Sequence, residues 1–239
     1  MIRRRGRGLI IIDFQTILKT VCSTITSCKI KSFPIDCHKL LHAFEYKLVK
    51  YSSLSNTKRA ACFLLSEDAI TIQEKKSIYY NDEKPEMRIR FSLMHELGHI
   101  LLDSEEESAA NIFASNILAP RIAIQYSCKN YKDVMNLFGL SEEAADIAFN
   151  DYKRWRRFIV THNNKMNETD EVLYNHFYNK RIKKFVYQTS ECVICGRKMY
   201  NTFDPDCGVC TLPRYSYSAF NELDQQLQVA ENSWLYGEY

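Results

Sequence analysis

The sequence predicts an α+β protein, in which a small antiparallel sheet and two long helices precede a helical region and a small metal-binding module. Three observations predict this class. Short runs with strand character come first, helical periodicity follows, and the last part is short, rich in turn residues and bears cysteines. The strand-like runs are residues 47–51, 60–65, 69–72 and 77–80.

The bulk composition is that of an ordinary soluble globular protein. The chain has 239 residues, of which 46% are hydrophobic and 26% charged, enough for one sizeable domain and an appendage. A formal charge of +3 is too small to indicate nucleic acid by itself. Basic runs at residues 3–7, 153–157 and 180–184 are interpreted as solvated faces.

The N-terminus and the cysteines bear on the compartment. Apolar residues 9–12 follow a basic run, but Asp13 interrupts them and no small-residue cleavage site follows soon, so we expect no export signal. No stretch is long enough to cross a bilayer. Nine cysteines are an odd number, and four of them form Cys-x-x-Cys units. This pattern favours metal binding in the reducing cytoplasm over a disulfide framework.

Apolar periodicity and the positions of proline residues predict the first helices and the turn that follows the last strand-like run. Residues 12–28 have the apolar spacing of an amphipathic helix, and Pro34 suits the start of the next. Residues 81–85 form a turn after the last strand-like run. Helices are then expected from about residue 86 to 102, from 105 to 118 (before Pro120), from 131 to 138 and from 142 to 158.

These elements predict five segments along the chain. They are an N-terminal helical segment at 1–29, a core of short strands and paired helices at 30–125, a helical region at 126–184, a cysteine-bearing module at 185–215 and a tail at 216–239.

The central motif is His95-Glu96-Leu97-Gly98-His99. Residues four apart on a helix share one face, so both imidazoles can bind a single ion. Zinc suits imidazole and carboxylate ligands, and a catalytic site keeps one position for water, whose pKa the metal lowers. Glu96 flanks the same face and can reach that water without being a ligand. It is therefore the predicted catalytic base, which can later deliver a proton to the leaving amine.

The surrounding helix and the next segment support a metal site. Gly98 lowers helix stability, which suggests that something packs closely there. Small residues at 108–110 let the following helix lie near the first. We expect the third ligand to be an acidic residue or histidine close after Leu102.

Two sequence blocks resemble the ImmA/IrrE family of metallopeptidases. They are residues 88–94 running into the histidine motif and residues 110–120, and the resemblance covers about residues 30–160. It implies a zincin-like domain. Aligned on Ala110, Asn111 and Ala114, the family pattern makes Glu107 the third zinc ligand. The family often has a second Glu where this chain has Ala109, a mild departure.

An alternative assignment of Glu107 stays open. Ser104-x-x-Glu107 also fits a helix capping box, which would turn the Glu107 carboxylate towards backbone amides. Glu105 and Glu106 would then be the replacement ligands.

Residues 131–158 resemble a helix-turn-helix. Gly139 can end one helix and Ser141 can cap the next. The second helix starts with Glu142, Glu143 and Asp146, a poor start for approaching phosphates. Its basic end, with Trp155, could touch an acidic partner. Helical packing is therefore favoured over direct DNA contact.

The C-terminal cysteines predict a second, structural zinc. Cys192 and Cys195 are separated by eleven residues from Cys207 and Cys210, and two such knuckles can surround one tetrahedral ion. Gly196 frees the first turn. Such a site is closed and would not catalyse; two unrelated reduced pairs or a redox pair are the alternatives.

The leading functional hypothesis is a cytoplasmic zinc endopeptidase with one catalytic and one structural ion. The resemblance implies a helix-turn-helix repressor as substrate, one that governs a mobile element or stress response. The second hypothesis is a non-catalytic regulator, stabilised by zinc, that binds a protein or DNA. Glu96 separates the two, because a structural site needs no base.

Overall fold

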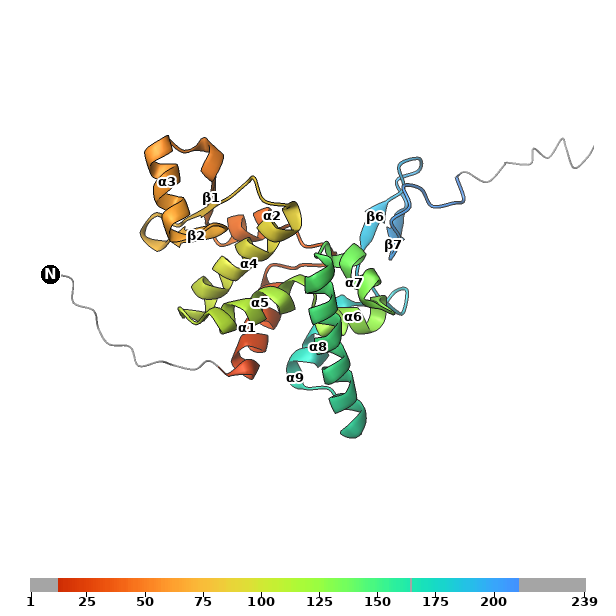
Figure 1. Cartoon of the computed structure of the whole chain (residues 1–239). Coiled ribbons are helices and arrows are strands. Elements are labelled where there is room, and N and C mark those ends of the chain that lie inside the picture. The colour runs from red at the N-terminus through yellow and green to blue at the C-terminus, as the bar shows by residue number, and fades with distance from the viewer. Residues whose placement is uncertain (1–12, 164, 211–239) are drawn as a thin grey trace, which may run out of the picture. The chain divides into compact units, whose positions relative to one another are not determined.

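The computed structural model describes residues 13–163 and 165–210, which fall into two compact units divided after Thr189. The basic run at residues 3–7 and the tail at 216–239 lie outside the described residues. Figure 1 shows the order of the elements. Within the described ranges, every helix is too short or too polar to cross a bilayer.

The first unit contains a three-stranded mixed sheet with the strand order β1-β3-β2. β1 (Lys47–Lys50) pairs parallel with β3 (Ser77–Tyr80), and β2 (Ala69–Ile72) pairs antiparallel with β3. Three of the predicted strands are thus confirmed, but the expectation of a wholly antiparallel sheet was wrong. β2 is an edge strand.

The predicted strand at residues 60–65 is instead part of helix α3 (Asn56–Leu65). Two parallel strands need a long crossover connection, which commonly contains a helix, and α3 lies in the segment between β1 and β3. The helix buries only Cys62 well, and Leu64 and Leu65 stay exposed. The apolar residues at 60–65 therefore belong to a helix that is mostly exposed, neither a strand nor a helix of the core.

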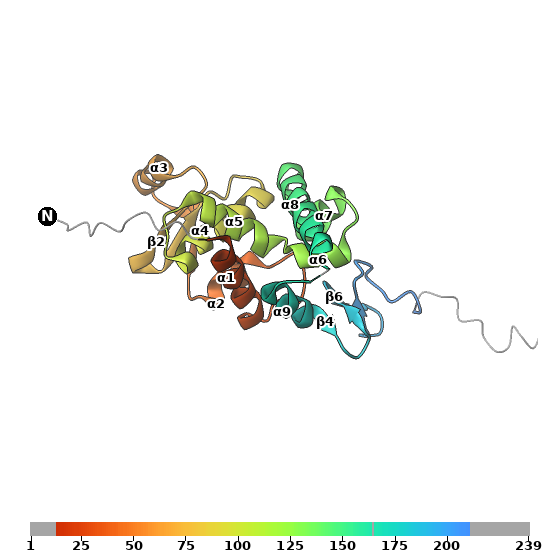
Figure 2. The same ribbon diagram turned by 90° about the horizontal axis from the view of Figure 1, so that it is seen from below.

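Two long helices form the centre of this unit. α4 (Glu86–Leu102) contacts both β2 and β3, and α5 (Glu107–Leu118) packs closely along α4. α4 matches the predicted range, and α5 begins two residues after the expected start. α1 (Phe14–Ser27) packs against α5, and the short α2 (Cys37–Ala43) contacts α4 and β1. In Figures 1 and 2 these helices lie together beside the sheet.

The helical region follows α5. It consists of α6 (Arg121–Ser127), α7 (Tyr131–Phe138), α8 (Glu142–Thr161) and α9 (Glu168–Phe177). As predicted, Gly139 ends α7 in a left-handed conformation (φ 63°), and the Ser141 side chain accepts a hydrogen bond from the Ala144 N–H.

A buried polar cluster joins α6, α8 and α9. Arg121 and Asp170 form an ion pair at 3.3 Å, and the Trp155 indole donates to the same Asp170 carboxylate at 2.8 Å. Trp155 is therefore a packing residue of this unit and is not exposed to a partner, whereas contact of the basic residues around it with an acidic partner stays a prediction. The small β4–β5 pair (Tyr178–Asn179 with Lys184–Phe185) follows α9.

The second unit is small. A two-stranded sheet of β6 (Thr189–Glu191) and β7 (Lys198–Tyr200) carries two cysteine-bearing turns.

Candidate active site and cysteine cluster

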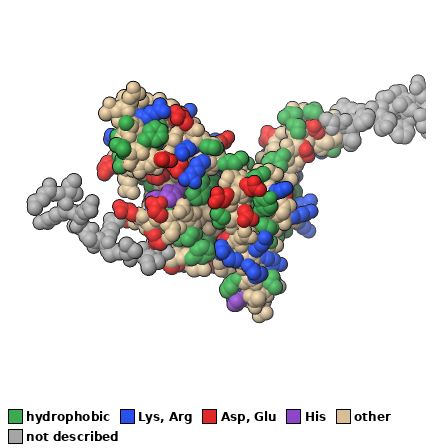
Figure 3. Space-filling view, in the orientation of Figure 1, with side chains coloured by type: hydrophobic (Ala, Val, Ile, Leu, Met, Phe, Trp, Pro, Cys, Tyr) green, Lys and Arg blue, Asp and Glu red, His purple; other side chains and the backbone are tan. Residues whose placement is uncertain are grey.

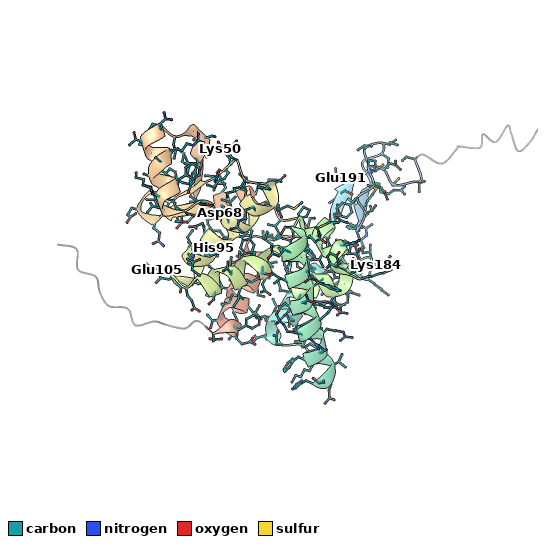
Figure 4. All side chains as sticks on the ribbon, in the orientation of Figure 1. Lys50, Asp68, His95, Glu105, Lys184 and Glu191 are labelled. Atoms are coloured by element: carbon teal, nitrogen blue, oxygen red, sulfur yellow. The ribbon has the colours of Figure 1, made fainter. Side chains whose placement is uncertain are left out.

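α4 presents His95, Glu96 and His99 on the side that faces the sheet and the start of α5. The Nε2 atoms of His95 and His99 lie 3.0 Å apart, as expected for imidazoles one helical turn apart that point to one place. Both rings are partly buried. Figure 4 shows His95 between the sheet side, marked by Asp68, and Glu105 before α5. Figure 3 shows histidine at the molecular surface, close to acidic side chains.

Glu107, the first residue of α5, faces both imidazoles. Its Oε2 lies 3.1 Å from His95 Nε2, and its Oε1 lies 3.5 Å from His99 Nε2. One ligand atom from each of these three residues lies within 4.8 Å of the others. The structure thus brings together the three side chains that the sequence and the resemblance predicted as ligands.

The capping-box alternative does not match this geometry. The Ser104 hydroxyl accepts a hydrogen bond from the Glu106 N–H at 3.1 Å, and Glu106 occupies the N-cap position of α5. The Glu107 carboxylate is therefore directed to the histidines rather than to backbone amides. Neither Glu105 nor Glu106 joins the cluster of potential ligands among the described residues.

The other nitrogen of each ring is held by an oxygen atom. His99 Nδ1 lies 2.7 Å from the Ser104 carbonyl oxygen, and His95 Nδ1 lies 2.9 Å from Asn111 Oδ1. A carbonyl oxygen only accepts, so each Nδ1 carries a hydrogen, and the tautomer with Nε2 unprotonated directs its Nε2 lone pair inward. Such partners orient histidine ligands in metal sites.

These groups fit a zinc ion. Two inward lone pairs and a carboxylate repel one another unless a cation lies between them. Zn–N bonds of 2.0–2.1 Å in a tetrahedral site would separate the two nitrogens by about 3.3 Å, close to the observed 3.0 Å. Two imidazoles and one carboxylate also form a donor set that leaves the fourth position open.

Glu96 lies beside the three potential ligands without joining them. The Thr71 hydroxyl on β2 donates to Glu96 Oε2 at 2.6 Å. Burial raises the pKa of the Glu96 carboxyl, while the Thr71 hydrogen bond and the nearby histidines act in the opposite direction. The side chain is thus a partly desolvated carboxyl group that one neighbour holds in place.

Gly98 explains how α5 comes close enough to bring Glu107 to the site. A Cβ atom on Gly98 would lie 3.1 Å from the Ala110 Cα and 3.2 Å from both the Ala110 oxygen and Phe113 Cδ1. These contacts are tight, and two of them involve backbone atoms that cannot simply rotate away. The expectation of close packing at Gly98 is confirmed.

Sequence reasoning assigned no role to Thr71 or Asn111. Asn111 follows Glu107 by four residues, so it shares the same face of α5, and this spacing could have indicated it. Thr71 is far from Glu96 in sequence and reaches it only through the packing of β2 on α4.

In the second unit, the sulfur atoms of Cys192, Cys195, Cys207 and Cys210 form a cluster within 4.8 Å. Cys195 and Cys207 Sγ are 3.9 Å apart, and Cys207 and Cys210 Sγ are 3.5 Å apart. A disulfide would place two sulfurs at about 2 Å. Four Zn–S bonds of 2.3 Å would instead separate them by about 3.8 Å, so the cluster fits a tetrahedral ion.

Backbone N–H groups surround one of these sulfurs. The amides of Cys195, Ile194 and Cys207 are directed at Cys192 Sγ, and they lower the pKa of this thiol to about 6. Gly196, with φ 69°, allows the turn that closes the first knuckle. A stabilised thiolate is the form of cysteine that binds metal.

Comparison with known proteins matches the segment that contains α4 and α5. No curated protein matches the chain. One family model does match: peptidase family M78, described as the IrrE N-terminal-like domain, aligns with residues 65–150. This range contains the histidine motif, Glu107 and both sequence blocks that suggested the resemblance. Over residues 65–150 the chain is therefore similar to a metallopeptidase domain of the ImmA/IrrE type.

Proposed function

We propose that this protein is a zinc-dependent endopeptidase in which His95, His99 and Glu107 hold the catalytic ion and Glu96 is the base. One observation carries the proposal: two inward Nε2 atoms 3.0 Å apart face a carboxylate, and a partly buried glutamate stands next to them without joining the ligand set. A site used only for stability has no need of that glutamate.

Zinc bound there would lower the pKa of a coordinated water molecule and polarise the carbonyl group of the scissile bond. The protein's own residues supply the remaining steps. Glu96 accepts a proton from the water molecule as its oxygen attacks the carbonyl carbon. It then delivers that proton to the leaving nitrogen, so that one water and one peptide bond give a carboxylic acid and an amine, which at neutral pH become a carboxylate and an ammonium group.

The substrate we propose is a helix-turn-helix repressor, one that governs a mobile element or a stress response. The support is the resemblance to the ImmA/IrrE family, whose members cleave or inactivate such repressors. The cytoplasm is the proposed compartment, because paired Cys-x-x-Cys thiolates suit metal binding in a reducing environment.

The four cysteines of the second unit are proposed to bind a structural zinc. The supporting observations are the separations of 3.5 and 3.9 Å between neighbouring sulfurs and the backbone amides directed at Cys192. Four protein ligands leave no open position, so this ion would stabilise the small unit and take no part in hydrolysis.

A cleavage assay with the Glu96→Gln variant tests the function. The purified wild-type protein and the variant are each loaded with zinc and incubated with a purified candidate helix-turn-helix repressor. We expect the wild type to produce defined fragments by mass spectrometry, and the variant to lose nearly all activity while keeping its zinc. Glu105→Gln, an exposed neighbour outside the ligand cluster, is the matched control and should cleave normally.

The assay also separates the peptidase from a regulator that acts by binding. Equal loss of the repressor with wild type and Glu96→Gln would contradict the assignment of the base. An intact repressor bound equally by both proteins would support a non-catalytic role.

A further inference from the structure

Thr71 occupies an unusual position in the sheet. On β2, Ala69 and Thr71 lie on the same face, opposite Tyr80 and Ile78 of β3. Ile78 is fully buried and Ala69 and Tyr80 are nearly so. Thr71 is therefore the polar member of an apolar row that faces α4.

The outer face of the same strand shows the reverse pattern. Ile70 and Ile72 lie on the side opposite to Thr71, and both are only partly buried. A strand placed for burial alone would turn its isoleucines inward and its threonine outward. The hydroxyl in the inner row therefore needs a local explanation.

Glu96 supplies that explanation. The Thr71 Oγ1 donates to Glu96 Oε2 at 2.6 Å, the short range of a hydrogen bond to a carboxylate. Among the described residues, no hydrogen bond reaches Oε1, so this oxygen stays available for a proton. Since threonine is branched at Cβ, few rotamers are open to it on a strand, and the hydroxyl is held rigidly.

We propose that Thr71 is a positioning residue for Glu96: it fixes one carboxylate oxygen so that the other is directed at the attacking water molecule. This inference rests on the proposed function, because it assigns Glu96 the role of base. A glutamate side chain has several rotatable bonds, and a misplacement of about 1 Å can lower the rate by up to about a hundredfold. Anchoring to the edge strand prevents such displacement.

Two substitutions separate the hydroxyl from the shape of the side chain. Thr71→Val keeps the branched shape and removes the donor, whereas Thr71→Ser keeps the donor and removes the methyl group. Turnover is measured on a pool of fluorescence-quenched peptides, using the peptide that the wild type cleaves fastest. We expect Thr71→Val to lower kcat roughly ten- to a hundredfold with little change in KM. Thr71→Ser should restore most of kcat.

Zinc content and thermal stability should be the same in the wild type and both variants. The proposal is overturned if Thr71→Val keeps the wild-type kcat, or if Thr71→Ser is as impaired as Thr71→Val. The latter result would show that packing, not the hydroxyl, matters.

A structural measurement keeps the inference testable without activity. In crystals of the zinc-free protein, we expect Glu96 to keep its rotamer in the wild type and in Thr71→Ser, and to leave it in Thr71→Val. An unchanged Glu96 conformation in Thr71→Val would overturn the positioning role. If the wild type cleaves no peptide or repressor, the proposed function fails on its own, and the crystal comparison still decides whether Thr71 positions the side chain.

Discussion

At the scale of single residues, the hydrogen bonds on the far side of each imidazole prepare the site. The Ser104 carbonyl oxygen and Asn111 Oδ1 hold the Nδ1 hydrogens, so both Nε2 lone pairs are directed at one point before any ion arrives. In the empty site the two lone pairs repel each other. A bound cation removes this repulsion, and its relief contributes to the free energy of metal binding. Glu107 adds the negative charge that two neutral rings lack.

Glu107→Ala should remove the catalytic zinc. The alanine leaves two neutral imidazoles to hold the ion, and loss of one of three protein ligands weakens binding strongly. We expect elemental analysis after extensive dialysis to fall from about two zinc ions per chain to about one. Glu105→Ala and Glu106→Ala are the controls and should keep both ions. Unchanged zinc in Glu107→Ala would reject this ligand.

At the scale of elements, helix bounds that depend on local sequence signals were predicted, whereas elements that depend on long-range packing were not. The bounds of α4 and α7 follow from local features, such as the turn before α4 and Gly139 after α7. The run at residues 60–65 has no clear period, and only the parallel pairing of β1 with β3 requires a long connection, in which a helix is common. No pattern within the run contains that information.

The same distinction applies to the candidate site. His95, Glu96 and His99 lie within one helical turn, so their spacing alone placed them on one face. Glu107 needed the family pattern, because the connection after α4 decides where the carboxylate points. Thr71 could not be predicted, since its contact with Glu96 joins residues 25 positions apart through the register of a sheet edge.

The contact between α4 and α5 depends on Gly98. Its missing side chain leaves room for the Ala110 backbone, and this closeness brings the start of α5 to the histidines. Gly98→Val should therefore push the two helices apart and lower the free energy of unfolding by about 2 kcal/mol, within the usual range for overpacking.

Denaturant unfolding measures the stability change, and zinc titration should show weaker binding at the catalytic site as well. Ala61→Val, at an exposed position of α3, also places a valine side chain on a helix and serves as the control. Equal stability of Gly98→Val and wild type would show that the helices can separate without cost.

At the scale of the whole molecule, the chain combines two potential metal sites of different chemistry in two compact units. The histidine and carboxylate ligands come from the first unit, and the four thiolates come from the second. No residue is shared between the two sets. The two ions should therefore be lost independently when their own ligands are changed.

Cys207→Ser tests this independence at the cysteine cluster. Cys207 Sγ lies near both Cys195 and Cys210, so a serine in its place breaks the tetrahedral set. We expect zinc to fall from about two ions to about one per chain, with peptide cleavage retained. Cys28→Ser, outside the cluster, should keep both ions, and Cys207→Ser combined with Glu107→Ala should keep neither. Two ions in Cys207→Ser would exclude a four-cysteine site. Loss of cleavage together with both ions would show instead that the second unit supports the first, because the catalytic ligands themselves are unchanged.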